Sequence, residues 1–289
     1  MDQQDKNSVL SRQRWELDSR PVNVIAIGSQ VVYGTVGLSA SVPVLNSYGL
    51  KVAALPTAML SNLPHYPNVH AADLSGPWLN DALHDLTALG VADEASTVYT
   101  GYFATPQQVG AVADWIRELL ERRPQLRVIV DPTLGDYDVG AYTDPAVAGV
   151  LREQLLPLAT GIVPNLFELH HLLGREPDQT PSTEQVAADA RLLLAGRCRW
   201  IAVTGLKHAA NQQAGARGQN LVLTPDSLDV IDFERLESGA KGTGDVMAAS
   251  IIAGLHQGLG IVESVYRAGI GVRERLVARS LELSSKNNL

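Results

Sequence analysis

The sequence contains very little cysteine: Cys198 is the only one among 289 residues. A single cysteine cannot form a disulfide within the chain or supply a cysteine-based zinc site, and it fits a reducing compartment. Long apolar runs are also missing, since none approaches the ~20 residues that a membrane-spanning helix needs. Residues 1–20 are polar and mixed in charge, without the apolar segment of a secretory signal. We therefore expect a cytoplasmic protein that does not enter the membrane.

Strong positive charge is absent as well. The chain has 23 Lys and Arg against 31 Asp and Glu, a net charge of −8, and no run of basic residues. This composition predicts no nucleic-acid partner. Several catalytic signatures are missing too, because the chain has no P-loop sequence, no G-x-S-x-G and no H-E-x-x-H. Gly34 and Gly37 have the wrong spacing for a dinucleotide-binding G-x-G-x-x-G.

What is present is a regular alternation of strands and helices. Short apolar runs that end in a polar residue predict strands at 22–27, 51–55, 97–100, 127–131 and 200–204, and a late hairpin at 221–223 and 228–232. Helical segments lie at 77–89, 106–122, 144–156, 166–173, 183–195, 245–257 and 261–283. This order predicts an α/β fold with a mainly parallel sheet covered on both faces. We expect one domain over 21–283, a flexible extension at 1–20, a tail at 284–289 and a mobile loop at 205–218.

The most informative motif is Lys241-Gly242-Thr243-Gly244-Asp245, directly before an apolar helix. Its glycines let backbone N–H groups approach an anion closely, and the helix start adds positive dipole character. Asp245, at the same point, can accept a proton from an attacking hydroxyl. Phosphoryl transfer needs all three features, so we predict that Gly242, Gly244 and Asp245 are catalytic. The alternative is an ordinary helix N-cap.

Acidic residues follow two further strands. Asn165 begins a helix and Glu168 lies at the same helix end, where a carboxylate can hold Mg²⁺ directly or through water. The same two residues also fit a capping box. Asp131 ends a strand at the sheet edge where ligands of such folds bind. A glycine-rich loop follows it, with Asp136 and Tyr142, and turn formation is the alternative role for these acids.

Hydroxyl and imidazole groups lie after other strands. Ser29 follows the first predicted strand, the second leads to a loop that contains His65, and Thr204 ends a later strand. Ser29 and His65 suit a small polar heterocycle, and the Thr204 hydroxyl can bond a phosphate oxygen. Each residue alone has an ordinary explanation as a surface or strand-end group. Together they place polar groups at one edge of one sheet.

The order V-D-P, N-x-x-E, V-T-G and G-T-G-D resembles the ribokinase-like superfamily of small-molecule kinases. S-Q-V-V-Y-G at 29–34, S-N-L-P-H-Y at 61–66 and T-G-Y at 100–102 further resemble the pyridoxal (vitamin B6) kinase family. The similarity runs from residue 22 to residue 275. It implies a three-layer sandwich that catalyses ATP-dependent phosphorylation of the 5′-hydroxyl of pyridoxal, pyridoxine or pyridoxamine. With pyridoxal as the substrate, the product would be pyridoxal 5′-phosphate, and the enzyme would serve vitamin B6 salvage.

The resemblance also implies roles for the matching positions. Substrate contacts would come from Ser29, Val36, His65, Tyr102 and Asp245, the last as the base. ATP contacts would come from Asp131, Asn165, Thr204, a covering segment Asp232-Phe233-Glu234-Arg235, and the loop Lys241-Gly242-Thr243-Gly244. The metal region would comprise Asp136, Tyr142 and Glu168. Mg²⁺ is the implied cofactor, with ATP as co-substrate, and participation of a monovalent cation is left open. The family implies a homodimer, for which 36–44 is a candidate interface.

Three positions depart from the family pattern: Val163, Gly205 and Leu38. They leave open the details of nucleotide contact, and they do not touch the base or the anion loop. Lys241 carries a separate hypothesis, because its amine could form a Schiff base with the aldehyde of pyridoxal. Two alternatives to a vitamin B6 kinase remain, namely a hydroxymethylpyrimidine kinase of thiamine synthesis and a non-catalytic vitamin B6 binder.

Overall fold

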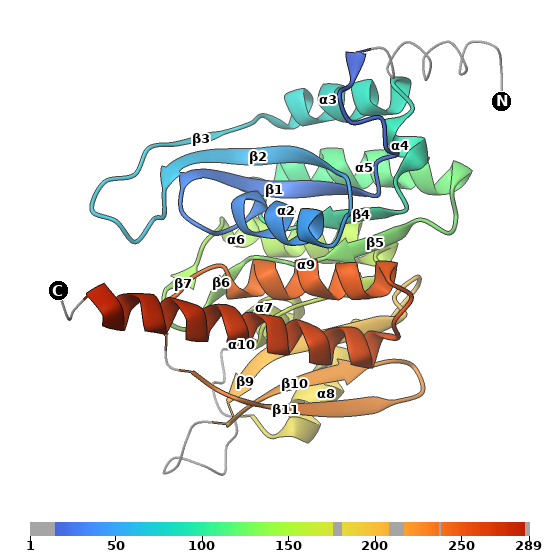
Figure 1. The fold of residues 1–289 in the computed structure, drawn as a ribbon. Helices are drawn as coiled ribbons and strands as arrows, with labels where there is room; N and C mark the ends of the chain where they lie inside the picture. The colour runs from blue at the N-terminus through green and yellow to red at the C-terminus, as the bar shows by residue number, and fades with distance from the viewer. Residues whose placement is uncertain (1–14, 176–180, 208–216, 237, 287–289) are drawn as a thin grey trace.

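A nine-stranded sheet forms the centre of the molecule (Figure 1). The computed structural model describes residues 15–175, 181–207, 217–236 and 238–286, and the strand count refers to these residues. Across the sheet the strands are β11 (Leu228–Glu234), β10 (Arg217–Leu223), β9 (Trp200–Lys207), β8 (Gly161–Ile162), β5 (Arg127–Val130), β4 (Thr97–Thr100), β1 (Val24–Tyr33), β2 (Val52–Asn62) and β3 (Ala71–Asp73). Neighbours from β9 to β2 are parallel, and the remaining pairs at both edges are antiparallel. A separate small hairpin joins β6 (Gly135–Asp136) to β7 (Gly140–Ala141).

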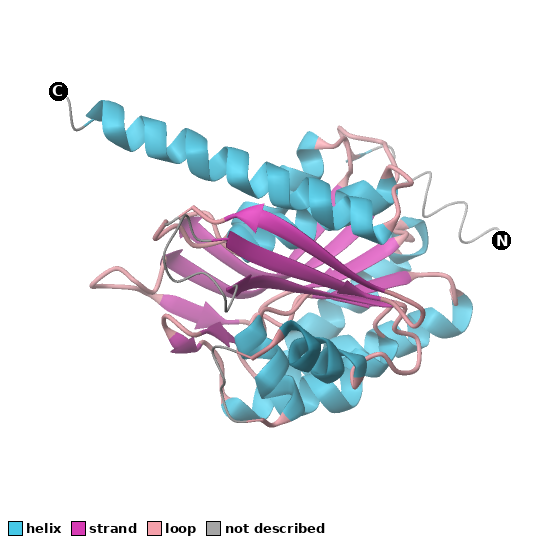
Figure 2. Ribbon diagram, turned by 90° about the horizontal axis from the view of Figure 1, so that it is seen from below, coloured by secondary structure: helices cyan, strands magenta, loops and turns pink. Residues whose placement is uncertain are grey.

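Helices cover both faces of the sheet, which gives three layers (Figure 2). One face carries α2 (Leu38–Ser47), α9 (Thr243–His256) and α10 (Ile261–Lys286). The other carries α3 (Gly76–Ala88), α5 (Pro106–Arg122), α6 (Pro145–Val150), α7 (Leu166–Leu173) and α8 (Thr183–Arg191), with the short α4 (Val91–Glu94) nearby. None of the helices in the described part of the chain combines the length and apolarity required to cross a membrane. The predicted α/β architecture is confirmed.

The first strand shows why the sheet is covered twice. Val24 and Ala26 are buried in the cluster shared with α2 and α9, whereas Ile25 and Ile27 are buried in the cluster shared with α3 and α5. Successive side chains of a strand point to opposite faces, so an uninterrupted apolar run needs apolar partners on both sides. Here, helices on both faces of the sheet supply these partners.

Local signals set several helix starts. Thr105 caps α5 through its side chain, Gln108 completes a capping box, and proline occupies the first turn. Asn165 and Glu168 form the same type of box at the start of α7. Such boxes satisfy backbone N–H groups that have no partner within the helix. The predicted helices at 106–122 and 166–173 are confirmed at both ends.

The first two strands are longer than predicted. The strands expected at 22–27 and 51–55 continue to Tyr33 and Asn62, because their backbones keep pairing as a ribbon beyond the body of the sheet. Ser29 therefore lies within β1 and not after it. The pairing is interrupted once: Gly28 pairs with Pro56 and Ser29 with Ala58, so that Thr57 has no partner on β1.

Other boundaries also differ. The helix predicted at 144–156 is α6 followed by a π-helical turn at Leu151–Leu155 and a 3₁₀ turn at Leu156–Leu158, whose proline has no N–H for a helical bond. Helix α10 continues to Lys286, so residues 284–286 of the predicted tail are helical. In the predicted mobile loop at 205–218, both ends are strand, and residues 208–216 lie outside the described residues.

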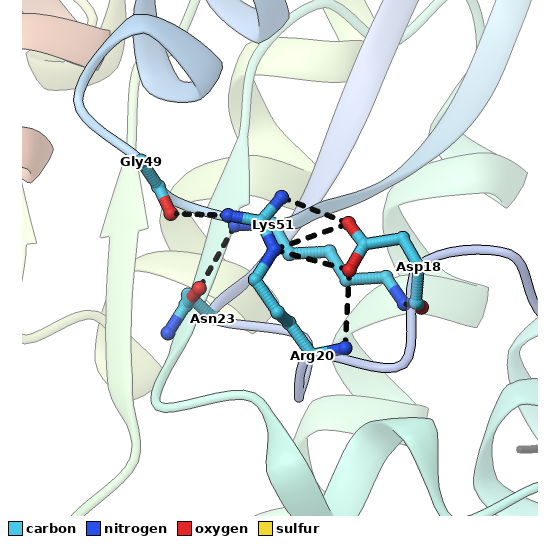
Figure 3. Close-up of polar contacts among 5 residues, drawn as sticks. All are labelled: Asp18, Arg20, Asn23, Gly49 and Lys51. Carbon is cyan, nitrogen blue, oxygen red and sulfur yellow. Dashed lines mark hydrogen bonds and ion pairs between the residues drawn. The ribbon is translucent and has the colours of Figure 1, made fainter.

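The last residues of the predicted N-terminal extension contact the body of the protein (Figure 3). Arg20 pairs with Asp18 at 2.8 Å, and its Nη1 donates to the Gly49 carbonyl at 3.0 Å. The Lys51 ammonium donates to the carbonyl of Asp18. Since Lys51 immediately precedes β2, these contacts attach residues 18–20 to the start of a core strand. Residues 1–14 lie outside the described residues.

Candidate active site

A cavity of about 730 Å³ opens at the carboxyl ends of the central strands. This is the edge at which ligands of open α/β sheets bind. Segments from β1 to α10 contribute to its wall. The cavity brings together nearly all of the predicted site residues: Ser29, Val36, His65, Tyr102, Asp131, Asp136, Tyr142, Asn165, Glu168, Thr204, Phe233, Glu234, Arg235, Lys241, Gly242, Thr243, Gly244 and Asp245.

Asp232 is the exception. It lies opposite Gln219 in the β10–β11 pair, and its Oδ1 accepts a hydrogen bond from Gln219 Nε2 at 2.9 Å. Its side chain is exposed, and Asp232 is not among the residues that line the cavity. Among the predicted site residues, Asp232 is the one outside the cavity wall, and its contact with ATP stays a prediction.

The anion loop has the backbone that its glycines predict. Gly242 is the N-cap of α9 with φ +87°, in the left-handed region that favours glycine. A Cβ atom there would lie 1.9 Å from the carbonyl oxygen of Thr35, so the loop packs directly on the turn that precedes α2. Asp245 lies in the first turn of α9 and not at the cap, and no side chain caps this helix. The alternative of an ordinary aspartate N-cap is therefore wrong.

Two aspartates in the cavity have strongly shifted acidities. Burial raises the pKa of Asp245 to about 6, although the backbone N–H of Gly37 opposes the shift. Burial, and then the negative charge of Asp245, raise the pKa of Asp131 to about 7, opposed by hydrogen bonds from Thr133. A carboxylate with a pKa near 6 is a good proton acceptor at neutral pH, since it is ionised yet basic.

The capping box considered for Glu168 is confirmed, and its metal-binding role stays a prediction. Its Oε2 accepts from the Asn165 N–H at 2.8 Å, and Asn165 Oδ1 accepts from the Glu168 N–H at 2.9 Å, which completes the capping box. Its Oε1 accepts from the Leu134 N–H at 3.1 Å. The carboxylate also lines the cavity, and burial, followed by the charge of Asp131, raises its pKa well above the usual value.

The β6–β7 hairpin is joined to the anion loop by an ion pair. Lys241 Nζ lies 2.9 Å from Asp136 Oδ2, which also accepts a hydrogen bond from the Tyr142 hydroxyl. Burial would raise the pKa of Asp136, but the bonds from Tyr142 and Lys241 lower it overall. A Schiff base needs a free amine, whereas the amine of Lys241 is engaged by this carboxylate. The arrangement therefore argues against the Schiff-base hypothesis.

The side chains that could act as metal ligands determine whether a cation fits the predicted metal region. Within the described residues, no three His, Cys, Asp or Glu side chains are grouped so that they could hold a metal ion by themselves. Mg²⁺ usually takes only one or two carboxylates, together with waters and substrate phosphates. Asp131 and Glu168 are buried carboxylates, and the charge of Asp131 raises the pKa of Glu168 further, so a nearby cation would stabilise their ionised forms. These two residues fit such a cation better than Asp136, which already pairs with Lys241.

The three departures from the family pattern take different places. Val163 and Gly205 line the cavity, where neither offers a side-chain hydroxyl to a ligand. Gly205 has φ +70°, and its N–H donates to Asn220 Oδ1 at 3.0 Å, so the backbone conformation itself favours glycine. Leu38 is buried in the core beneath α9 and does not line the cavity. Its departure concerns packing and not nucleotide contact.

One wall of the cavity was missed by the sequence analysis. Helix α10 contributes Gly269, Val272, Arg273 and Leu276. Arg273 also forms an ion pair at 2.6 Å with Glu234 of the covering segment. The only sequence signal was a pair of small residues, Gly269 and Gly271, within an otherwise regular helix.

Comparisons with known proteins agree with this geometry. The phosphomethylpyrimidine kinase family matches residues 81–288. A pyridoxine/pyridoxal/pyridoxamine kinase of Bordetella bronchiseptica is 42% identical over 256 residues, 89% of each chain. A pyridoxal kinase of Rubrobacter xylanophilus is 28% identical, over 84% of this chain and 83% of the relative.

A solved structure supports the same relationship. The pyridoxal kinase of Leishmania donovani, in complex with ADP and pyridoxamine, is 25% identical with a TM-score of 0.77, covering 87% of this chain and 88% of that one. Its fold is the ribokinase-like fold expected from the motifs. The chain therefore belongs to the phosphomethylpyrimidine kinase family, in the branch of the pyridoxine/pyridoxal/pyridoxamine kinases.

Proposed function

We propose that this protein transfers the γ-phosphoryl group of ATP to the 5′-hydroxyl of pyridoxal, and also of pyridoxine and pyridoxamine, in vitamin B6 salvage. One observation carries the proposal: a single cavity joins Ser29, His65 and Tyr102 to the anion loop and Asp245. A small polar alcohol bound beside Ser29, His65 and Tyr102 would present its hydroxyl to Asp245, the base. The names of the relatives support the same substrates.

Asp245 supplies the proton acceptor in this mechanism. Its carboxylate takes the proton of the 5′-hydroxyl as the oxygen attacks the γ-phosphorus, a contribution of about 10²–10⁴ in rate for general base catalysis. The bond from the γ-phosphorus to the bridging oxygen of ATP breaks, and ADP leaves. Backbone N–H groups at the start of α9 and the helix dipole stabilise the charge on the transferred group. The protein forms no covalent intermediate.

The nucleotide would occupy the other half of the cavity. Phe233, Glu234 and Arg235 cover it, Thr204 and Asn165 contact it, and the anion loop holds its phosphates. Asp131 and Glu168 would hold Mg²⁺ that accompanies the phosphates, and Mg²⁺ neutralises phosphate charge in such reactions. Asp136 would act through Lys241, with which it pairs, and Tyr142 would act through its hydrogen bond to Asp136.

The acidity of Asp245 predicts how activity depends on pH. A base must be deprotonated, so kcat/KM should rise with pH between about 6 and about 7, the pKa values of the neighbouring Asp245 and Asp131. Burial raises both pKa values, so activity is lost on the acid side, at a higher pH than an ordinary aspartate would allow. A pH–rate profile checks this. An acid limb at the usual aspartate value of about 3.9 would contradict it.

A second substrate deserves a direct comparison, because the matching family is described as phosphomethylpyrimidine kinase. We expect kcat/KM with ATP to be at least about tenfold higher for pyridoxal than for hydroxymethylpyrimidine, since pockets discriminate by their polar contacts. Steady-state rates of ADP formation on the two alcohols measure this. The opposite preference would assign the chain to thiamine synthesis. Binding of pyridoxal without turnover of either alcohol would favour a sensor.

We also propose that the protein is a cytoplasmic homodimer, as its family suggests. The candidate interface at 36–44 needs revision within that proposal. Leu38, Ala40 and Val44 of α2 are buried against α9 in a single copy of the chain. An interface there would use the exposed side of α2, which carries Pro43 and Asn46. Sedimentation velocity measures the oligomeric state.

A further inference from the structure

At the interruption between β1 and β2, the skipped residue Thr57 forms hydrogen bonds to other parts of the chain. Thr57 is skipped in the pairing and is fully buried. Its hydroxyl donates to the carbonyl of Tyr102 at 2.7 Å, and its own carbonyl accepts from Gln108 Nε2 at 2.9 Å and from the Leu74 N–H at 2.9 Å. The hydroxyl of Thr57 is therefore directed toward the loop that follows β4, and its carbonyl toward Gln108 of α5 and Leu74 after β3.

Gln108 is the centre of this cluster. Its side chain is fully buried, and Nε2 donates to the carbonyls of Thr57 and, at 2.6 Å, Leu74, while Oε1 accepts from the backbone N–H groups of Ala104 at 2.7 Å and Thr105 at 3.4 Å. A buried amide is unfavourable unless its hydrogen bonds are made. Here both atoms are satisfied entirely by backbone groups. The amide thus joins three chain segments: β2, the end of the β3 region and the β4–α5 loop.

These three segments lead to the alcohol-binding half of the cavity. The β4–α5 loop carries Tyr102, and β2 continues to the loop that carries His65. Ser29 pairs with Ala58, the residue directly after Thr57. The residues assigned to the nucleotide and its metal come instead from the end of β5, from β9 and β11, and from the starts of α7 and α9. None of the hydrogen bonds of Thr57 and Gln108 described above reaches those elements.

We infer that Thr57 and Gln108 are positioning residues for the alcohol substrate: they fix the Tyr102 loop against β2, and so set the shape of the vitamin half of the cavity without affecting the nucleotide half. This assignment rests on the proposed function. The link from Thr57 to Tyr102 is a single hydrogen bond, so it can be removed by one nearly isosteric change.

Thr57→Val removes the hydroxyl and keeps the volume. We expect the KM and the dissociation constant for pyridoxal to rise about 3- to 10-fold, the effect of one lost hydrogen bond, while the KM for ATP stays within about twofold of wild type. Initial rates with each substrate varied in turn, and calorimetric titration with pyridoxal, measure these constants. Thr57→Ser keeps the hydroxyl and should restore the KM for pyridoxal.

Thr87→Val is the matched control. The hydroxyl of Thr87 accepts from Trp115 Nε1 at 3.0 Å and donates to the Leu83 carbonyl at 3.0 Å, between α3 and α5 and away from the cavity lining. This variant should lower Tm without moving either KM.

Three results would overturn the assignment: an unchanged KM for pyridoxal in Thr57→Val, parallel increases of both KM values, or a failure of Thr57→Ser to restore wild-type behaviour. A wild-type enzyme that neither binds nor phosphorylates pyridoxal would contradict the proposed function and this assignment together. That failure is visible before any variant is measured, so the two failures are distinguishable.

Discussion

Asp245→Asn should lower the kcat of pyridoxal phosphorylation at least about 100-fold, because an amide cannot accept the proton of the attacking hydroxyl. The fold should survive the change. Gly242 is the N-cap of α9, and the side chain of Asp245 does not cap the helix. Turnover at saturating pyridoxal and ATP measures the effect, and thermal unfolding checks that the variant is folded.

Nucleotide binding separates loss of the base from damage to the site. Asp245 is close enough to Asp131 to raise its pKa, and it lies at the end of the loop that would hold the phosphates. Removal of one negative charge should therefore leave ATP affinity equal to or greater than that of wild type. Low turnover with weakened ATP binding would point to a disturbed loop. Turnover close to wild type would mean that Asp245 is not the base and that catalysis rests on positioning alone.

Gly242→Ala should have the next largest effect, a decrease of kcat/KM by about 10²–10³, the range seen when a backbone donor to a developing charge is lost. Two causes act together. The φ of +87° disfavours any residue with a Cβ, and the new Cβ would lie 1.9 Å from the Thr35 carbonyl oxygen. The loop must move away from the turn before α2, and its N–H groups move with it. Steady-state kinetics with ATP varied measure the loss.

Gly258→Ala isolates the first cause, the backbone strain. Gly258 has φ +83°, and a Cβ there meets nothing within 4 Å. It follows α9 at the end opposite the anion loop. The backbone strain should be similar, about 1–2 kcal/mol, so the variant should show a lower Tm and near wild-type kinetics. If Gly242→Ala behaves like this control, the packing of the loop on Thr35 is not required for activity.

Local signals account for most of what the sequence predicted correctly. The Thr105–Gln108 and Asn165–Glu168 boxes define helix starts within four residues of chain, and the G-T-G-D turn needs only its own glycines. The strand run at Val24–Ile27 is apolar on both faces, which predicts its burial without knowledge of its neighbours. Such features depend on neighbours along the chain, so they can be recognised without the fold.

The failures concern features that are set by distant residues. Ser29 and Gln30 interrupt the apolar pattern of β1, yet the strand continues because the equally long β2 pairs with it. The hydrogen bond between Asp232 and Gln219 depends on the register of β10 against β11. The ion pair between Lys241 and Asp136 joins residues 105 positions apart, and α10 contributes to the cavity only once it packs on the sheet. No local pattern encodes these contacts.

The distribution of the cavity wall along the chain has a consequence for folding. Its residues run from Ser29 in β1 to Leu276 in α10, and β1 must be inserted between β2 and β4 before the edge exists. Contacts between residues so distant in sequence form slowly. The chain loses the entropy of closing the loop between them before the contacts contribute any stabilising energy. A nascent chain that has not yet completed α10 lacks one wall of the cavity. The complete cavity wall therefore forms only after the chain has folded as far as α10.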